Sequence, residues 1–228
     1  MYDIVFISYN EPNAEENFSR LRARFPMVKR VDGVKGIHQA HIAAAKKCFT
    51  KMFWVVDGDA QVLDSFKFDH VVTQWDLDVV HVWRSKNPVN DLEYGYGGVK
   101  LLPRMLTLKM DTSTPDMTTS ISGKFKAMPE ISNITAFNTD PFNTWKSAFR
   151  ETVKLASKVI QGQVSYESEL RLLAWCEFRP DRQFSNWATL GAEDGKMYGI
   201  QNANDPVALS KINDFEWLHD KFSKYPVQ

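Results

Sequence analysis

The chain has 228 residues, which is enough for one sizeable domain, and 43% of them are hydrophobic, which argues against a disordered or low-complexity protein. The chain has 28 basic residues (Lys and Arg) and 28 acidic residues (Asp and Glu), so the net charge favours neither a nucleic-acid partner nor a membrane surface. No apolar run approaches the roughly 20 residues that span a bilayer, and we expect a cytoplasmic protein without a membrane partner. Cys48 and Cys176 form no CxxC motif, which indicates reduced thiols, with one long-range disulfide as the alternative.

The first part of the chain alternates short apolar runs with helical patterns. Strands are predicted over residues 4–7, 28–31 and 52–56, with helices over 14–25 and 37–49 between them. Asn13 and Glu16 resemble a capping box at the start of the first helix. This β-α-β-α-β order predicts an α/β fold with a doubly wound, mostly parallel sheet, whose ligands gather beyond the carboxyl ends of the strands.

The rest of the chain begins with strand patterns and ends in helical ones. Strands are predicted over 79–83 and 99–102, whereas the periodicity fades over 105–139, where we expect a long loop or a small subdomain. Helices are predicted over 140–160, 166–178, 185–198 and 214–222. The C-terminal region is therefore expected to be mainly helical.

The motif with the clearest chemistry follows the third predicted strand. Residues 53–59, FWVVDGD, deliver Asp57 and Asp59 two positions apart, so that an extended chain points both carboxylates to the same side. Gly58 leaves room for a ligand between them. Oxygen ligands suit Mg²⁺ or Mn²⁺, which commonly take their remaining ligands from substrate phosphates. The motif predicts a divalent-metal site, with an ordinary Asp-Gly turn as the alternative.

A strand that runs into DGD in the third βα unit resembles the GT-A glycosyltransferases, and the resemblance covers about the first hundred residues. Residues 35–45, KGIHQAHIAAA, are similar to the glycine and helix that precede the DxD motif in family 2 enzymes, with His38 and His41 where Arg and Asn are usual. The resemblance implies a single GT-A-like domain that binds a nucleotide-sugar, a UDP-sugar being expected, through residues 1–84. Residues 85–228 would form the acceptor side.

Polar residues near the predicted strand ends are candidates for binding this donor. His38 and His41 lie three apart near a helix N-terminus, where backbone amides favour an anion, although each is as compatible with a hydrogen-bonded structural role. Lys35 is a candidate phosphate partner. Asp32 occupies the place where GT-A enzymes often bind the nucleobase, but it is also a common turn residue. The remaining donor-site candidates are Ser8, Tyr9, Asp57, Gly58, Gly97 and Gly98.

Residues 90–102, NDLEYGYGGVKLL, are similar to the GT-A segment in which a glycine-rich turn enters a strand that lines the sugar and acceptor sites. The glycines permit close backbone approach. Tyr94 and Tyr96 are candidates for stacking on a sugar or a base, with packing at a sheet edge as the alternative. Asp91 is a candidate for contacting a sugar hydroxyl and for catalysis.

An inverting transferase needs a carboxylate that accepts the proton of the acceptor hydroxyl, and similar enzymes often carry it at the start of a helix after this strand. Glu167 and Glu169 are the candidates for this base. The alternative is that Glu in a first helical turn complements the helix dipole. A retaining enzyme needs no such base, so the stereochemistry stays open.

Residues 191–199 and 211–218 resemble the tail of GT-A-like proteins of T-even-type tailed phages. Several such phages use glycosyl or arabinosyl transferases to modify 5-hydroxymethylcytosine, so the resemblance implies DNA carrying this base as an acceptor. Phosphate contacts would need only a local basic patch. The candidates for this patch are Lys100, Arg104, Lys109, Lys124 and Lys126.

Other functions remain open at this stage. A transferase that acts on a surface glycan or a small acceptor has the same donor site. A nucleotidyltransferase shares the fold and the metal carboxylates, but the loop over residues 8–13 lacks the glycine-rich phosphate loop usual in that class. A non-catalytic protein that binds sugar nucleotides is the third alternative.

Overall fold

The computed structural model describes residues 1–95, 97–114, 116–159 and 164–226, and it divides the chain into two compact units. The N-terminal unit comprises Met1–Asn87, Glu93–Ser113 and Met117–Ala136, and the C-terminal unit comprises Pro88–Leu92, Thr114–Asp116 and Phe137–Gln228. The main division thus lies near residue 136. The assignment of residues 1–84 to the donor and 85–228 to the acceptor concerns function and stays a prediction. Both cysteines are free thiols.

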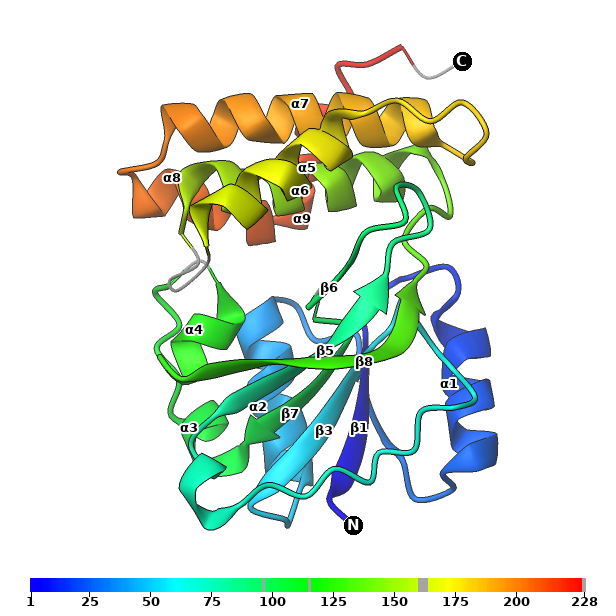
Figure 1. The fold of residues 1–228 in the computed structure, drawn as a ribbon, viewed down its shortest axis with the longest axis vertical. Helices are drawn as coiled ribbons and strands as arrows, with labels where there is room; N and C mark the ends of the chain where they lie inside the picture. The colour runs from blue at the N-terminus through cyan, green and yellow to red at the C-terminus, as the bar shows by residue number, and fades with distance from the viewer. Residues whose placement is uncertain (96, 115, 160–163, 227–228) are drawn as a thin grey trace. The chain divides into compact units, whose positions relative to one another are not determined.

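Across the described residues, the N-terminal unit forms an eight-stranded sheet in the order β2-β1-β3-β7-β5-β8-β4, with β6 paired to β5 (Figure 1). The strands are β1 (Asp3–Ser8), β2 (Lys29–Asp32), β3 (Met52–Asp57), β4 (Ala60–Val62), β5 (Val80–Lys86), β6 (Glu93–Tyr94), β7 (Val99–Pro103) and β8 (Phe125–Thr135). The predicted α/β class and the early strand order are confirmed.

The prediction of a mostly parallel sheet is wrong, because the sheet is mixed. β1 pairs in parallel with β2 and β3, and β5 with β8, whereas β7 runs antiparallel to both β3 and β5. The pairs β4–β8 and β5–β6 are also antiparallel. A fully buried strand such as β7 shows the same mainly apolar pattern in either direction, so its sequence could not indicate its polarity.

Helices cover both faces of this sheet. α1 (Ala14–Arg24) packs on one face, in a cluster that includes Trp54 and Trp83. α2 (Ile37–Lys47), α3 (Arg104–Leu108) and α4 (Met117–Ile121) contribute to the apolar cluster on the other face. A short 3-10 helix, η1 (Gln74–Asp76), precedes β5. The expected capping box at α1 is wrong, since Asn13 makes no side-chain cap and its Nδ2 instead donates to Ala136 O at 2.9 Å.

The region expected to be a long loop or subdomain, residues 105–139, instead contains α3, α4 and the strand β8. β8 curves across the sheet in Figure 1 and pairs with β5 on one side and with β4 on the other. Its first residues are exposed and include Pro129, and only its second half is largely buried. The alternating apolar pattern that marks a strand is therefore missing from the first half of β8.

The C-terminal unit is mainly helical over its described residues, as predicted. Its helices are α5 (Pro141–Ser157), α6 (Ser165–Cys176), α7 (Ser185–Gln201), α8 (Pro206–Ser210), η2 (Lys211–Asn213) and α9 (Phe215–Phe222). Asp140 caps α5 by accepting from Asn143 N at 2.7 Å, and Pro141 occupies the first turn, which confirms the predicted helix start. The predicted end of this helix at Ile160 lies outside the described residues.

Three glycines on one face of α7 allow it to pack closely on α5. They recur every fourth residue, which places them on the same face of the helix. An added Cβ would lie 2.3 Å from Trp145 O at Gly191, 2.3 Å from Phe149 O at Gly195 and 2.7 Å from Val153 O at Gly199. The glycines within residues 191–199 thus have a packing role, whatever the resemblance of that segment implies.

Candidate functional site

Polar residues of the N-terminal unit meet at one edge of its sheet. The parallel register places Ser8 opposite Asp32 and Ile7 opposite Asp57. Since the carboxyl ends of parallel strands share one edge, the structure brings the candidates on β1 and β2 next to the DGD turn, residues 57–59.

The backbone of the DGD turn is fixed at every residue. The hydrogen bonds run from Asp57 N to Gly98 O (2.9 Å), from Asn17 Nδ2 to Gly58 O (2.9 Å) and from Ala136 N to Asp59 O (2.7 Å). The partners come from the residue before β7, from α1 and from the residue after β8. Paired backbone groups of this kind hold a buried turn in one conformation, so the carboxylates of the turn start from a defined position.

The space beside Gly58 is filled by a carboxylate. A Cβ on Gly58 would lie 2.5 Å from Glu11 Oε2, which also accepts a hydrogen bond from Tyr9 N at 2.6 Å. The sequence predicts that Gly58 leaves this space for a ligand, whereas in the structure the Glu11 carboxylate occupies it. Three carboxylate side chains, those of Glu11, Asp57 and Asp59, therefore belong to the turn and its immediate surroundings.

Asp57 is held by an ion pair with Lys100. The Lys100 Nζ donates to both carboxylate oxygens of Asp57, at 2.8 Å each, and also to Gly97 O. The Lys100 side chain is 3% exposed, whereas that of Asp57 is 35% exposed. The prediction that Lys100 belongs to a local basic patch for DNA phosphates is wrong, because this ammonium is buried inside the N-terminal unit.

His41 and His38 differ in their surroundings on α2. His41 is buried, its Nδ1 donates to Ile37 O at 2.8 Å, and its Nε2 has no hydrogen-bond partner among the described residues. Burial, and next the Lys100 ammonium, lower the pKa of His41 to about 3, so the ring is neutral at pH 7. A neutral ring with an acceptor at Nε2 suits a hydroxyl or N–H group better than a phosphate oxygen. His38 is half-buried, and its Nε2 lies 3.1 Å from Ser120 Oγ.

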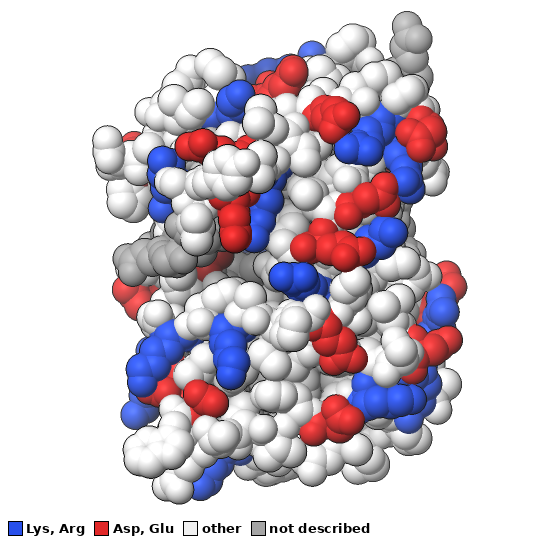
Figure 2. Space-filling view, viewed as in Figure 1, with Lys and Arg blue, Asp and Glu red and all other residues white. Residues whose placement is uncertain are grey.

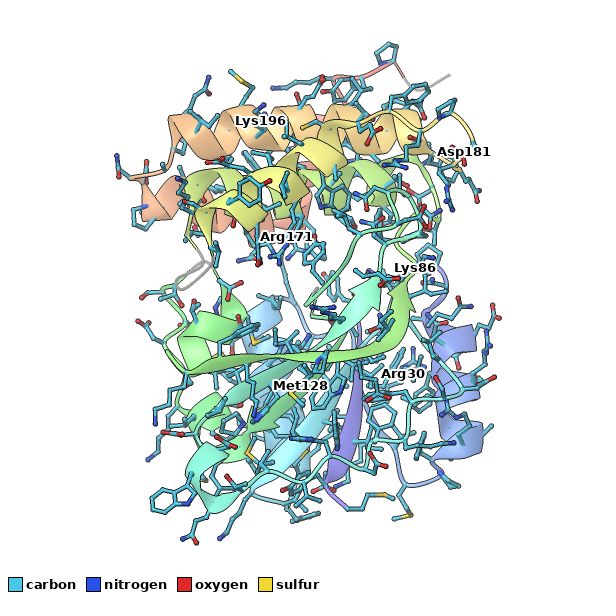
Figure 3. All side chains as sticks on the ribbon, viewed as in Figure 1. Arg30, Lys86, Met128, Arg171, Asp181 and Lys196 are labelled. Carbon is cyan, nitrogen blue, oxygen red and sulfur yellow. The ribbon has the colours of Figure 1, made fainter. Side chains whose placement is uncertain are left out.

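A second polar cluster forms where β1 and β2 end. Ser8 Oγ donates to Asp32 Oδ1 at 2.5 Å, and Arg30 Nε donates to Ser8 Oγ at 3.1 Å. Arg30, labelled in Figure 3, also stacks over the ring of Phe18, with its guanidinium carbon 4.9 Å from the ring centroid. Ser8 is buried and Asp32 is exposed, so Asp32 is the member of this cluster that a ligand can reach.

Tyr9 and Lys35 lie in the loops that follow β1 and precede α2. Tyr9 is half-buried and Lys35 is exposed. α2 begins after Gly36, which has a φ of +94° and supplies no side-chain cap. This positive φ angle favours glycine at position 36, because residues with a side chain rarely adopt it.

Gly97 and Gly98 form the turn that enters β7. Gly97 has a φ of +90°, and a Cβ on Gly98 would lie 2.5 Å from Asn133 Nδ2. Asn133 belongs to a network of buried hydroxyl and amide groups whose other members are Ser85, Ser132 and Thr135. Tyr94 is buried in β6, in keeping with the packing alternative, and Tyr96 lies outside the described residues.

The three catalytic candidates belong to the C-terminal unit. Asp91 forms an ion pair with Arg182. Glu167 lies in the first turn of α6 and pairs with Arg171, which Figure 3 labels, at 3.1 Å. Glu169 is exposed on the same helix. Their catalytic roles stay predictions.

Sequence reasoning missed Glu11 and Asn17 as parts of the site, and it assigned Lys100 to the basic patch. Asn17 and Lys100 carried a detectable signal. Asn17 occupies a position on α1 between Ala14 and Leu21, which both face the core, and Lys100 interrupts the apolar run of β7. A polar residue at a position that the pattern assigns to the core indicates a buried partner. Glu11 carried no such signal, because a charged residue in a loop is the ordinary case.

The DGD turn carries two carboxylates of the chemical kind that binds a divalent ion together with its ligand. The described residues contain no group of three or more His, Cys, Asp or Glu side chains that could hold a metal. Mg²⁺ and Mn²⁺ are commonly bound by one or two carboxylates together with substrate phosphates. Asp57 and Asp59 are carboxylates of this type. Asp57, however, already shares its charge with Lys100.

Comparison of the chain with protein-family models found no match, and comparison with curated proteins found none. The helices of the described residues are all too short or too polar to serve as membrane-spanning segments. The case for a function therefore depends on the site itself.

Proposed function

We propose that the protein is a metal-dependent glycosyltransferase of the GT-A type, which transfers a sugar from a nucleotide-sugar, with a UDP-sugar as the expected donor. The observation that carries this proposal is the DGD turn at the carboxyl end of β3, a strand inside the sheet that pairs in parallel with β1. All three of its residues are fixed by hydrogen bonds from other elements. A turn prepared in this way supports binding of a charged ligand better than an ordinary surface turn does.

The neighbouring residues supply groups for each part of such a donor. Asp32 and Tyr9 are suited to the nucleoside, and exposed Lys35 before α2 is suited to the diphosphate. Asp59 would contribute to holding Mn²⁺ or Mg²⁺, which when bound stabilises negative charge on the leaving diphosphate.

For the acceptor side, we propose Asp91, Glu167 or Glu169 as the group that accepts the proton of the acceptor hydroxyl. The proposed acceptor is 5-hydroxymethylcytosine in DNA. Of the basic candidates, Lys109, Lys124 and Lys126 are exposed, and Lys124 pairs with Asp78 at 2.6 Å. Figure 2 shows Lys and Arg interspersed with Asp and Glu on the face in view, so DNA would contact a local group of cations.

A donor screen tests the proposed activity. The protein is incubated with Mn²⁺ and a panel of nucleotide-sugars, and released nucleoside diphosphate is measured with and without hydroxymethylated DNA. We expect one donor to release diphosphate faster when the DNA is present, and mass spectrometry of the digested DNA to show a hexose or pentose on hydroxymethylcytosine.

The same screen separates the alternatives. Release of pyrophosphate would indicate a nucleotidyltransferase. Binding of a nucleotide-sugar without release of either product would indicate a binding protein. Diphosphate release with an unmodified DNA product would keep the transferase and reject DNA as its acceptor.

A further inference from the structure

Lys100 places a buried positive charge directly beside the DGD turn. Its neighbours in the sheet register are Val55 on β3 and Val82 on β5, which are 0% and 1% exposed. A charged side chain in such surroundings costs free energy unless it is paired and hydrogen-bonded. The ion pair with Asp57 at 2.8 Å supplies that partner.

The hydrogen bonds of Lys100 exclude a role in phosphate binding. An ammonium group has three N–H donors. The two oxygens of Asp57 and Gly97 O are three acceptors for them. With all donors used and the side chain buried, Lys100 acts on the carboxylate of Asp57.

A divalent ion and this ammonium would compete for the same carboxylate. Charge-assisted hydrogen bonds from Lys100 reach both oxygens of Asp57, and a cation bound to either oxygen would be repelled by the ammonium.

We infer that Lys100 is a positioning residue that turns both oxygens of Asp57 onto an internal cation, so that Asp57 is not a ligand of a divalent ion bound in this site. The inference rests on the proposed function, because it assigns the metal ligands within the proposed donor site. It removes Asp57 from the candidate metal ligands of the motif and leaves Asp59 as a candidate.

The decisive variant removes both members of the pair. Asp57→Asn with Lys100→Met leaves no unpaired buried charge, and replacing a buried ion pair by neutral groups is often tolerated. Mn²⁺ affinity is measured by the electron paramagnetic resonance signal of free Mn²⁺, with the full chain alone and with UDP, after circular dichroism has shown that each variant is folded. We expect the double variant to retain the wild-type affinity within about threefold and Asp59→Asn to lose at least about tenfold.

The single variant Asp57→Asn tests whether Lys100 acts on metal binding through its charge, because a purely structural role of Lys100 would not produce the pattern of Mn²⁺ affinities expected here. It leaves the Lys100 charge unpaired, so Mn²⁺ binding should weaken by repulsion, and the further change Lys100→Met should restore it. Such a rescue by removal of a second residue indicates electrostatic repulsion and not a lost ligand.

Two results would overturn the inference. The first is a double variant that loses as much Mn²⁺ affinity as Asp59→Asn, which would make Asp57 a metal ligand. The second is a wild-type protein that binds no Mn²⁺ with or without UDP. Neither result decides the transferase itself, because diphosphate release from a nucleotide-sugar, followed with Mn²⁺ and with EDTA, is measured separately in the wild-type protein.

Discussion

Glycine has different purposes in the two units of this protein. In the N-terminal unit, Gly58 and Gly98 allow the polar side chains of Glu11 and Asn133 to approach the chain. In the C-terminal unit, the glycines of α7 allow the backbone of α5 to approach instead. The helical glycines recur every fourth residue, whereas those of the site lie in turns that border strands. Regular spacing thus indicates packing between helices, and a glycine in a turn at a strand end indicates a polar neighbour or a ligand.

The largest expected effect tests whether the DGD turn is a functional site. Asp59→Asn should lower diphosphate release by at least about a hundredfold, which is ~2.7 kcal/mol in the barrier, because it removes an anionic metal ligand without changing shape. The rate is measured over a Mn²⁺ titration, with Asp64→Asn, at an exposed loop carboxylate, as the control. Near-normal turnover of Asp59→Asn would make the DGD motif an ordinary turn.

The next effect concerns stability and the packing glycines. Gly195→Ala should lower the free energy of unfolding by about 2–3 kcal/mol, the upper range for overpacking, since the helices must separate to admit the methyl group. Its Cβ would lie 2.3 Å from both Phe149 O and Thr152 Oγ1. Urea denaturation measures the change, and Gly123→Ala is the matched control because nothing lies within 4 Å of its added Cβ. Equal stability of the two variants would remove the packing role.

The dependence of stability on pH should differ between the two units, because the buried histidines among the described residues, His41 and His81, lie in the N-terminal unit. The pKa of His41 falls from its ordinary 6.5 to about 3 in the folded chain, so the unfolded state takes up the proton first as the pH falls. The stability from the neutral ring is complete above pH 6.5 and is lost towards pH 3, at about 1.4 kcal/mol per pH unit. His81, whose pKa burial also lowers, adds a contribution of the same sign.

Hydrogen exchange at several pH values measures this loss in each unit. His41→Leu should flatten the dependence in the N-terminal unit between pH 6.5 and pH 5, while His219→Gln, at an exposed position of α9, should leave it unchanged. An unaltered slope in His41→Leu would mean that another group causes the acid sensitivity.

The smallest effect concerns Gly98. Gly98→Ala should cost about 1 kcal/mol, because Asn133 must move away from the added methyl group and strain its hydrogen bonds to Ser132 and Thr135. In the background of Asn133→Ala the same change should cost much less, and thermal denaturation of the four proteins measures this coupling. Additive effects would show that Asn133 is not what requires glycine at position 98.

The sequence by itself determined the local parts of this protein. The run of apolar residues before DGD fixed β3 and the turn after it, and Asp140 with Pro141 fixed the start of α5, because caps, turns and periodicity act over a few neighbouring residues. The order of the early strands and helices followed from the same patterns, and so did the helical character of the C-terminal region.

Only the tertiary structure decided the direction of β7, the existence of β8 and the partner of Asp57. A buried strand has the same pattern in either direction, and an exposed half-strand such as the start of β8 has hardly any pattern. Lys100 stands 43 residues from Asp57, so the pair exists only because β7 lies beside β3 in the sheet. The charge of Lys100 within an apolar run indicated that a buried partner was needed, and the order of the strands determines that this partner is Asp57.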